Sequence, residues 1–197
     1  MKKLFSLFPA IVIVFAACKA PIKNNETKFY SSEFKWTISV PGGFTLVSKD
    51  KQAKMARKGE EALEKTYNNK VINQAKNIFI FQNGRANYFQ ANYEPFDTSK
   101  DGNFIENFHL VNNLIYGTFV AQMKDAQVDS SSSAQTVNGL TFQTFTVVVT
   151  ITNKGKMTLR EYSRLFDKKQ FTVAMTTTDP MLEQQLLDSW LNSKFDK

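Results

Sequence analysis

The sequence predicts a single α+β domain in which helices pack against a mainly antiparallel sheet. Segments with strand periodicity follow one another through short turns, which join antiparallel neighbours, whereas parallel strands need long crossovers. Three segments with helical periodicity lie between or after them, and an apolar helix stripe must be buried against another element. The 197 residues suit one domain and are enough to bury a core.

A hydrophobic segment precedes this domain. Two lysines are followed by a charge-free run over residues 4–17, and the only cysteine of the chain, Cys18, comes directly after it. The run is shorter than the roughly 20 apolar residues that a membrane-spanning helix needs. This layout is typical of a secretory signal peptide, which we assign to residues 1–17.

The end of that segment, Phe15-Ala16-Ala17-Cys18, resembles the lipobox of bacterial lipoproteins. The resemblance implies that Cys18 is acylated and becomes the first residue of the mature chain. Each buried lipid methylene contributes about 0.8 kcal/mol, so several acyl chains would hold the protein on a lipid bilayer. We therefore expect a cell-envelope protein on a bacterial membrane, with the outer membrane favoured over the inner one and the domain facing the periplasm or exterior. The alternative is a cysteine that merely follows an ordinary cleavage site.

Residues 18–32 join the lipid to the domain. They are polar with one proline, which predicts a flexible tether that reaches on the order of 20 Å. The domain then spans residues 33–197. Since Cys18 would be lipidated, this domain has no cysteine for a disulfide, a thiol nucleophile or a metal site.

The first strand and helix of the domain differ strongly in polarity. Residues 34–40 alternate between apolar and polar side chains, the pattern of a half-buried strand. Residues 48–67 are charged, with only a thin apolar stripe, so this helix is expected on the outside. Ser48 or Asp50 is expected to cap it.

The middle of the chain predicts a hairpin and a second helix. Asn83-Gly84-Arg85 separates two apolar runs, residues 77–82 and 86–94, and Asn-Gly is a strong hairpin signal. Residues 104–124 have helical periodicity, and Asn103 with Glu106 resembles a capping box. The expected core-facing side chains of this helix are Phe104, Phe108, Val111, Ile115 and Phe119.

The C-terminal third predicts a meander and a last helix. Residues 127–137 are a loop or an exposed edge strand, and Asn138-Gly139 makes the next hairpin turn. Three strands follow, over residues 140–152, 157–166 and 171–178. The apolar positions of the first change parity, so a bulge near Gln143-Thr144 is expected to keep them on one side. Asp179-Pro180 begins a helix that packs on the sheet.

Two stretches of the domain are similar to PsbP-like domains. They are Val40-Pro41-Gly42-Gly43-Phe44 and the meander from Gly139-Leu140-Thr141-Phe142, which closes with a helix near Ser193-Lys194-Phe195. The resemblance covers residues 34–195 and implies an α/β/α sandwich around an antiparallel sheet. Members of this family are mostly accessory or assembly proteins, and many bacterial ones are uncharacterised lipoproteins. The resemblance carries over no catalytic motif.

The basic net charge does not indicate nucleic-acid binding. The formal charge is +7, and five basic residues gather between positions 49 and 58. Glu60, Glu61 and Glu64 follow directly, so a solvated helix face explains the cluster. An exported protein also has little contact with DNA, so we expect no nucleic-acid partner.

One loop hints at a metal. Residues 97–103 place oxygen-bearing side chains at positions one, three and five and Gly102 at position six, as in a calcium loop. Position twelve, where such a loop has a bidentate Glu, is Phe108. A turn that leads into a capped helix explains the same residues, so we predict no metal and no cofactor.

The sequence favours a binding protein over an enzyme. The only histidine, His109, lies at the polar edge of its helix stripe, and the chain has no G-x-S-x-G motif. We predict a non-enzymatic envelope lipoprotein that presents its domain to a protein partner or small ligand. The alternative is a hydrolase or carbohydrate-processing enzyme that uses Asp97, Asp101 or Glu106, with two carboxylates facing each other roughly 5–10 Å apart.

Aromatic side chains could line a groove that binds a small ligand. Burial in the core explains most of the aromatic residues of the chain better than a ligand groove does. If a groove exists, the tyrosines are the best candidates to line it, since their hydroxyls tolerate water. The candidates are Trp36, Tyr88, Tyr93 and Tyr116.

Overall fold

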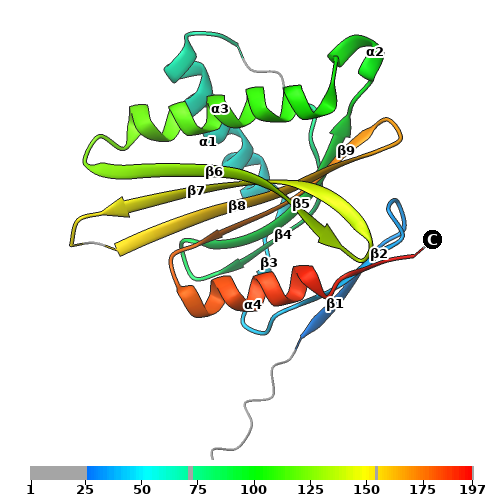
Figure 1. The fold of residues 1–197 in the computed structure, drawn as a ribbon. Helices are drawn as coiled ribbons and strands as arrows, with labels where there is room; N and C mark the ends of the chain where they lie inside the picture. The colour runs from blue at the N-terminus through cyan, green and yellow to red at the C-terminus, as the bar shows by residue number, and fades with distance from the viewer. Residues whose placement is uncertain (1–25, 71–72, 154, 197) are drawn as a thin grey trace, which may run out of the picture.

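The computed structural model describes residues 26–70, 73–153 and 155–196 (Figure 1). The predicted signal peptide and Cys18 lie outside the described residues. The elements in chain order are β1 (Thr27–Ser31), β2 (Trp36–Val40), β3 (Thr45–Leu46), α1 (Lys49–Tyr67), β4 (Lys76–Asn83), β5 (Asn87–Pro95), α2 (Thr98–Asp101), α3 (Phe104–Gln122), β6 (Ala126–Val137), β7 (Leu140–Ile151), β8 (Gly155–Phe166), β9 (Lys169–Thr177), α4 (Pro180–Leu191) and β10 (Lys194–Phe195).

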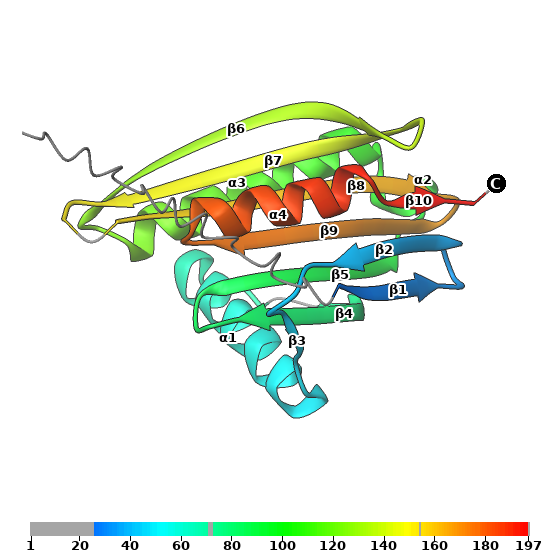
Figure 2. The same cartoon turned by 90° about the horizontal axis from the view of Figure 1, so that it is seen from below.

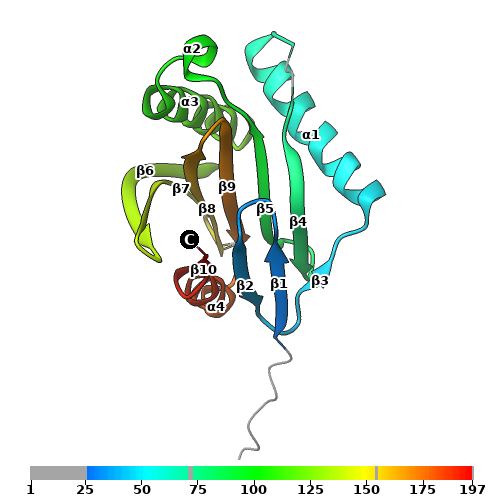
Figure 3. The same ribbon diagram turned by 90° about the vertical axis from the view of Figure 1, so that its right-hand side faces the viewer.

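The described strands form two antiparallel sheets. The larger has the order β3-β4-β5-β9-β8-β7-β6, and the smaller has the order β1-β2-β10. Helices α1 and α3 lie on one face of the larger sheet, and α4 lies beside the smaller sheet on the other face (Figures 2 and 3). The predicted α+β class and the α/β/α sandwich are confirmed.

The main core lies between the larger sheet and the layer of α4 and the smaller sheet. Trp36 of β2 and Trp190 of α4 are fully buried, with ring centroids 6.0 Å apart. Phe142 of β7 lies 5.0 Å from Trp190 and Phe171 of β9 lies 5.2 Å from Trp36. Burial of one such large side chain contributes about 1.5–3 kcal/mol. These rings therefore attach α4 and the smaller sheet to the larger sheet.

A second core lies on the opposite face, under α3. It contains Phe108 of α3 with Phe145, Val147 and Val149 of β7. Because Phe142 belongs to the first core and Phe145 to the second, β7 is covered on one face near its start and on the opposite face further along.

The prediction of a bulge in β7 is wrong, because both faces of this strand have covered positions. Strand β7 pairs with β6 in continuous register from Ile151 to Leu140, and with β8 from Ile151 to Gln143. The change in parity of the apolar positions reflects two covered faces and needs no extra residue.

The predicted tether ends earlier than residue 32. Thr27–Ser31 forms β1, which pairs with β2 from Thr27 opposite Val40 to Ser31 opposite Trp36. The ring of Phe29 packs against that of Phe79 with centroids 4.9 Å apart. The folded domain therefore includes residues that the sequence assigned to the tether, because their polar composition hid an edge strand that pairs with β2.

The predicted hairpin turns and the caps of α3 and α4 are confirmed. Gly84 has φ +67°, and Asn138 and Gly139 have φ +48° and +78° in the two-residue turn between β6 and β7. Such positive φ values favour Asn and Gly. The Asn103 side chain accepts hydrogen bonds from the backbone N–H groups of Ile105 and Glu106 at the start of α3. Asp179 caps α4 in the same way.

The expectations for α1 and β6 also hold, but two details, one in α1 and one in α3, are corrected. Helix α1 buries no residue, and β6 is an edge strand with mostly exposed side chains. Ser48 is the N-cap of α1, but its side chain makes no capping hydrogen bond. Val111, expected in the core-facing stripe of α3, is 39% exposed, and Asn112 is buried instead at 2%.

Candidate functional site

The predicted lipidation site, Cys18, lies outside the described residues, so the anchor stays a prediction. None of the helices in the described ranges is long and apolar enough to span a membrane.

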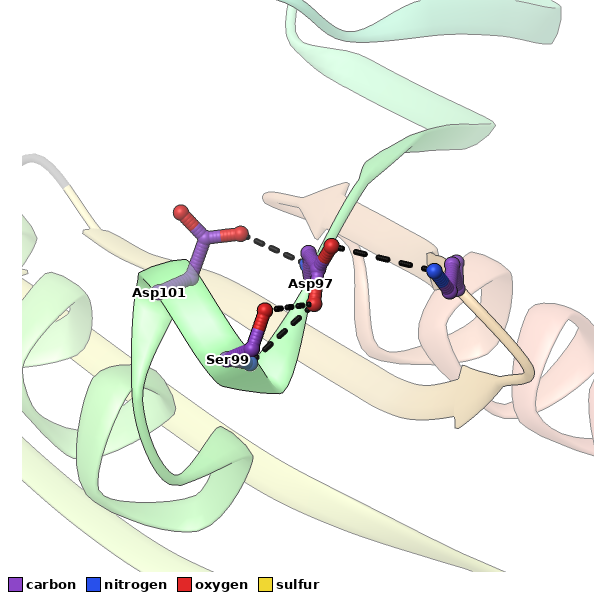
Figure 4. Close-up of polar contacts among 4 residues, drawn as sticks. Asp97, Ser99 and Asp101 are labelled. Atoms are coloured by element: carbon purple, nitrogen blue, oxygen red, sulfur yellow. Dashed lines mark hydrogen bonds and ion pairs between the residues drawn. The ribbon is translucent and has the colours of Figure 1, made fainter.

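The Asp97 loop is a structured turn (Figure 4). Asp97 Oδ1 accepts hydrogen bonds from Ser99 N at 3.1 Å and Ser99 Oγ at 2.7 Å. In return, Asp97 N donates to Asp101 Oδ2 at 2.6 Å, and Lys168 Nζ lies 3.8 Å from Asp97 Oδ2. Hydrogen bonds from Ser99 are the main reason that the pKa of Asp97 is lowered. Both carboxylates therefore cap and close α2.

This geometry favours the turn interpretation over calcium or acid catalysis. Among the described residues, no group of three or more His, Cys, Asp and Glu side chains could hold a metal ion. A general acid needs a pKa near the working pH, whereas that of Asp97 is lowered. Glu106, the third candidate carboxylate, is exposed in the first turn of α3.

His109 lies on the exposed side of α3. Its ring contacts that of Phe108 with centroids 5.8 Å apart, and its side chain is exposed. This is the boundary position that the helix pattern predicts.

The aromatic candidates for a groove have structural contacts. Trp36 is fully buried, and Tyr93 packs against Phe34 with ring centroids 5.4 Å apart. The hydroxyls of Tyr88 and Tyr116 donate to the carbonyls of Arg85 and Val128. Core packing and backbone hydrogen bonds therefore account for all four side chains.

Sequence reasoning missed a partly buried polar strip beneath α3, in which Glu161 and Glu94 are half-buried. Glu161 of β8 pairs with Phe145, so its side chain lies on the α3 side of the sheet. Burial, and then the charge of Glu94, raise the pKa of Glu161 to about 7. Burial, and then the charge of Asp101, also raise the pKa of Glu94.

Neutral polar groups accompany these carboxyls. Ser163 and Thr172, which pair across β8 and β9, join their hydroxyls at 3.1 Å on the same face. Neither amide atom of Asn112 has a hydrogen-bond partner among the described residues. The available sequence signal was Asn112 itself, a polar side chain four residues after Phe108 at a core-facing helical spacing.

One open hollow lies where the first turn, two hairpins and the C-terminal strand meet. Its volume is about 740 Å³. Phe34, Phe166 and Phe195 contribute its apolar lining, and Glu33 and Lys169 form an ion pair at its rim. Charges of both signs line it, so it has no clear preference for an anion or a cation.

A second concave region lies between α1 and α3. It consists of an apolar slot of about 310 Å³ and a neighbouring hollow of about 690 Å³, which share Ala62 and Gln122 in their linings. The hollow has three lysines and one glutamate in its lining. This is the region with the most definite ligand chemistry, an apolar slot beside a basic mouth, and we call it the α1–α3 groove.

The layers, strand order and two cores together define a PsbP-like fold. The chain is similar to the solution structure of cyanobacterial PsbP (CyanoP) from Synechocystis sp. PCC 6803, with a TM-score of 0.56 and 10% identity. The match covers 92% of this chain and 99% of that one. The predicted PsbP-like fold is therefore confirmed, while the site chemistry depends on this chain's own residues.

The other comparisons add no functional assignment. The chain is also similar to the Ran-binding protein Mog1p of Saccharomyces cerevisiae, with a TM-score of 0.43 and 10% identity over 87% of this chain and 96% of that one. No family model and no curated protein sequence matches the chain.

Proposed function

We propose that the protein is a lipid-anchored envelope lipoprotein whose PsbP-like domain acts as a non-enzymatic binding module. The observation that carries the proposal is Cys18, which follows a charged start, a short apolar run and two alanines. This arrangement supports cleavage before Cys18 and acylation of its sulfur. The domain is then held at a bacterial membrane, with the outer membrane favoured.

The start of β1 at Thr27 supports a domain held close to that membrane. Eight residues separate Cys18 from Thr27, and a chain of that length spans at most roughly 28 Å. Such a short link favours a partner that lies at or near the same membrane, or a ligand that is delivered there.

The geometry of the candidate acids supports a non-enzymatic role. Asp97 and Asp101 bond the backbone and side chain of their own turn, and His109 is exposed on α3. An envelope hydrolase acting through Asp97, Asp101 or Glu106 remains the alternative function, and no observation on these residues favours it.

The anchor is tested by replacing its cysteine. We expect the full chain to sediment with membranes as a shortened, lipidated protein, and Cys18→Ala to give a soluble or uncleaved product. Membrane fractionation and intact mass measurement distinguish these forms. Asn24→Ala, a change between Cys18 and β1, is the control and should behave as the wild type. A Cys18→Ala protein that sediments at mature size would contradict the anchor.

The binding role is tested by crosslinking in native membranes, with a tag at the C-terminus of the lipidated chain. We expect either a stoichiometric protein partner that Cys18→Ala fails to retain or a small ligand bound to the domain itself. A chain that recovers neither, and that hydrolyses envelope sugars or esters until Asp97→Asn removes the activity, would overturn the proposal in favour of the enzyme.

A further inference from the structure

Helix α1 contacts α3 at a few points near its C-terminal end. The Tyr67 hydroxyl donates to the Leu114 carbonyl at 2.7 Å, and Gln122 Nε2 donates to the Ala62 carbonyl at 3.0 Å. Although α1 has 19 residues, none of them is buried. Two well-packed helices would interdigitate their side chains along the contact. Here the polar contacts hold the helices together and leave the α1–α3 groove open.

The slot of the groove is lined by apolar side chains. Leu63 of α1 faces Ile115, Phe119 and Met123 of α3 across a volume of about 310 Å³. This volume lies at the lower end of the roughly 300–1,000 Å³ of small-molecule sites. If a methylene takes about as much room as a water molecule, about 30 Å³, the slot holds on the order of ten methylenes.

Gly59 keeps the slot open. A Cβ atom at this position would meet no heavy atom within 4 Å, so no neighbouring atom excludes a side chain here. Its φ is not in the left-handed region, and glycine in a helix interior is less stable than alanine by about 1 kcal/mol. The structure explains one effect of glycine at this position: because it has no side chain, it leaves the wall of the slot unfilled.

The mouth of the groove is basic. Lys58 and Lys65 of α1 and Lys124 after α3 line the hollow of about 690 Å³ together with Glu61. The Glu61 carboxylate already pairs with Arg57 at 3.3 Å. None of the three lysines has an ion pair within the described part of the chain. The mouth therefore favours an anionic group next to the apolar slot.

We propose that the α1–α3 groove binds a single-chain amphiphile with an anionic head group, of the fatty-acid class. The acyl chain occupies the apolar slot, and the carboxylate lies among Lys58, Lys65 and Lys124. A chain of about ten to twelve carbons matches the slot volume, whereas a two-chain phospholipid exceeds it. The inference names the ligand of the proposed binding module, so it rests on the binding role and not on the Cys18 anchor.

The position of the groove favours a bound ligand over contact with the bilayer. Figure 3 shows α1 and α3 across the larger sheet from β1, the strand that follows the Cys18 segment. The groove is therefore on the layer remote from the end of the domain that the anchor holds.

Photolabelling tests the inference on the full lipidated chain in native membranes. The probe is a photoreactive twelve-carbon fatty acid with an alkyne tag, and the labelled peptides are mapped by mass spectrometry. We expect saturable labelling confined to α1 and the C-terminal half of α3. Unlabelled dodecanoic acid should compete about tenfold better than dodecanol, because only the acid can pair with the lysines.

Gly59→Leu is the decisive variant because it fills the slot. We expect it to reduce labelling about tenfold or more, since the acyl chain loses buried apolar contact. Leucine is a better helix former than glycine, so the unfolding midpoint should not fall. Ala53→Leu adds a large side chain at an exposed position of the same helix and should label like the wild type. Replacing all three lysines with glutamine should make acid and alcohol compete equally.

Three results would overturn the inference. They are equal labelling of wild type and Gly59→Leu, labelling spread over peptides outside α1 and α3, and equal competition by acid and alcohol in the wild type. If the labelling fails but crosslinking still finds a protein partner, this inference is wrong and the proposed function stands. The two failures are therefore distinguishable. Conversely, the absence of a protein partner does not alter the labelling result.

Discussion

At residue 161 a carboxyl group lies beneath α3, next to the side chain of Phe145 on the same face of the sheet. Burial and the Glu94 charge raise its pKa from 4.5 to about 7. Between these values the folded state binds a proton that the unfolded state has released. The stability contributed by protonated Glu161 is therefore present at low pH and falls as the pH rises from about 4.5 to about 7.

Glu161→Gln tests this linkage, because glutamine has the shape of the protonated acid and does not ionise. We expect the variant to raise the free energy of unfolding at pH 8 by up to about 3 kcal/mol, the equivalent of the pKa shift. At pH 4.5 the gain should be much smaller. Urea denaturation at the two pH values measures both. Glu106→Gln removes an exposed carboxylate and should change little; an equal effect of Glu161→Gln at both pH values would contradict the linkage.

Among the helices and strands, the features that local chemistry determines were predictable from the sequence. The Asn138-Gly139 turn and the Asn103 and Asp179 caps depend on residues within three positions of each other. Local chemistry does not determine which faces of β7 are covered. The helices that cover them, α3 and α4, come from distant parts of the chain and lie on opposite faces of the larger sheet. The expected bulge and the inward position of Val111 were wrong for this reason. The α1–α3 groove was equally hidden, since it depends on how two helices meet.

The side chain of Tyr67 in α1 lies close to the backbone of α3 at Gly117. A Cβ atom there would lie 2.4 Å from the Tyr67 hydroxyl oxygen, so Gly117→Ala must displace the Tyr67 side chain. That movement breaks the hydrogen bond to the Leu114 carbonyl, which contributes about 1 kcal/mol. Alanine stabilises α3 itself by a similar amount. We expect little change in global stability but faster amide hydrogen exchange in α1.

Two further variants control for this effect. Gly59→Ala has open space around its added carbon, so it should stabilise α1 by up to about 1 kcal/mol and slow its exchange. Adding Tyr67→Phe to Gly117→Ala removes the clashing oxygen and should not accelerate exchange beyond Tyr67→Phe alone. Unchanged α1 exchange in Gly117→Ala would show that the Tyr67 contact does not hold the helix.

Over the whole molecule, one sheet separates two cores that differ in composition. The α4 side contains both buried tryptophans and most of the buried aromatic rings, whereas the α3 side combines two phenylalanines and two valines with the polar strip. The aromatic side was visible in the sequence as the alternation of β2 and the stripe of α4. The polar strip was not visible, because the burial of Asn112 and the partial burial of Glu161 depend on where α3 lies.

The aromatic core should therefore determine global stability, and Trp190 is its centre. Trp190 is fully buried and contacts Trp36, Phe142, Tyr162 and Phe195. We expect Trp190→Ala to reduce the free energy of unfolding by about 3–5 kcal/mol, because it removes apolar contact and leaves a cavity. Chemical denaturation followed by circular dichroism measures the loss.

Trp190→Phe separates packing from hydrogen bonding at this position. The indole Nε1 is buried without a hydrogen-bond partner among the described residues, so phenylalanine removes an unpaired polar group while retaining one ring. Its cost should be clearly below that of the alanine variant. If both variants lost a similar amount of the free energy of unfolding, the indole N–H would have to donate a stabilising hydrogen bond. A loss below 1 kcal/mol in Trp190→Ala would place the stability of the fold in the α3 core instead.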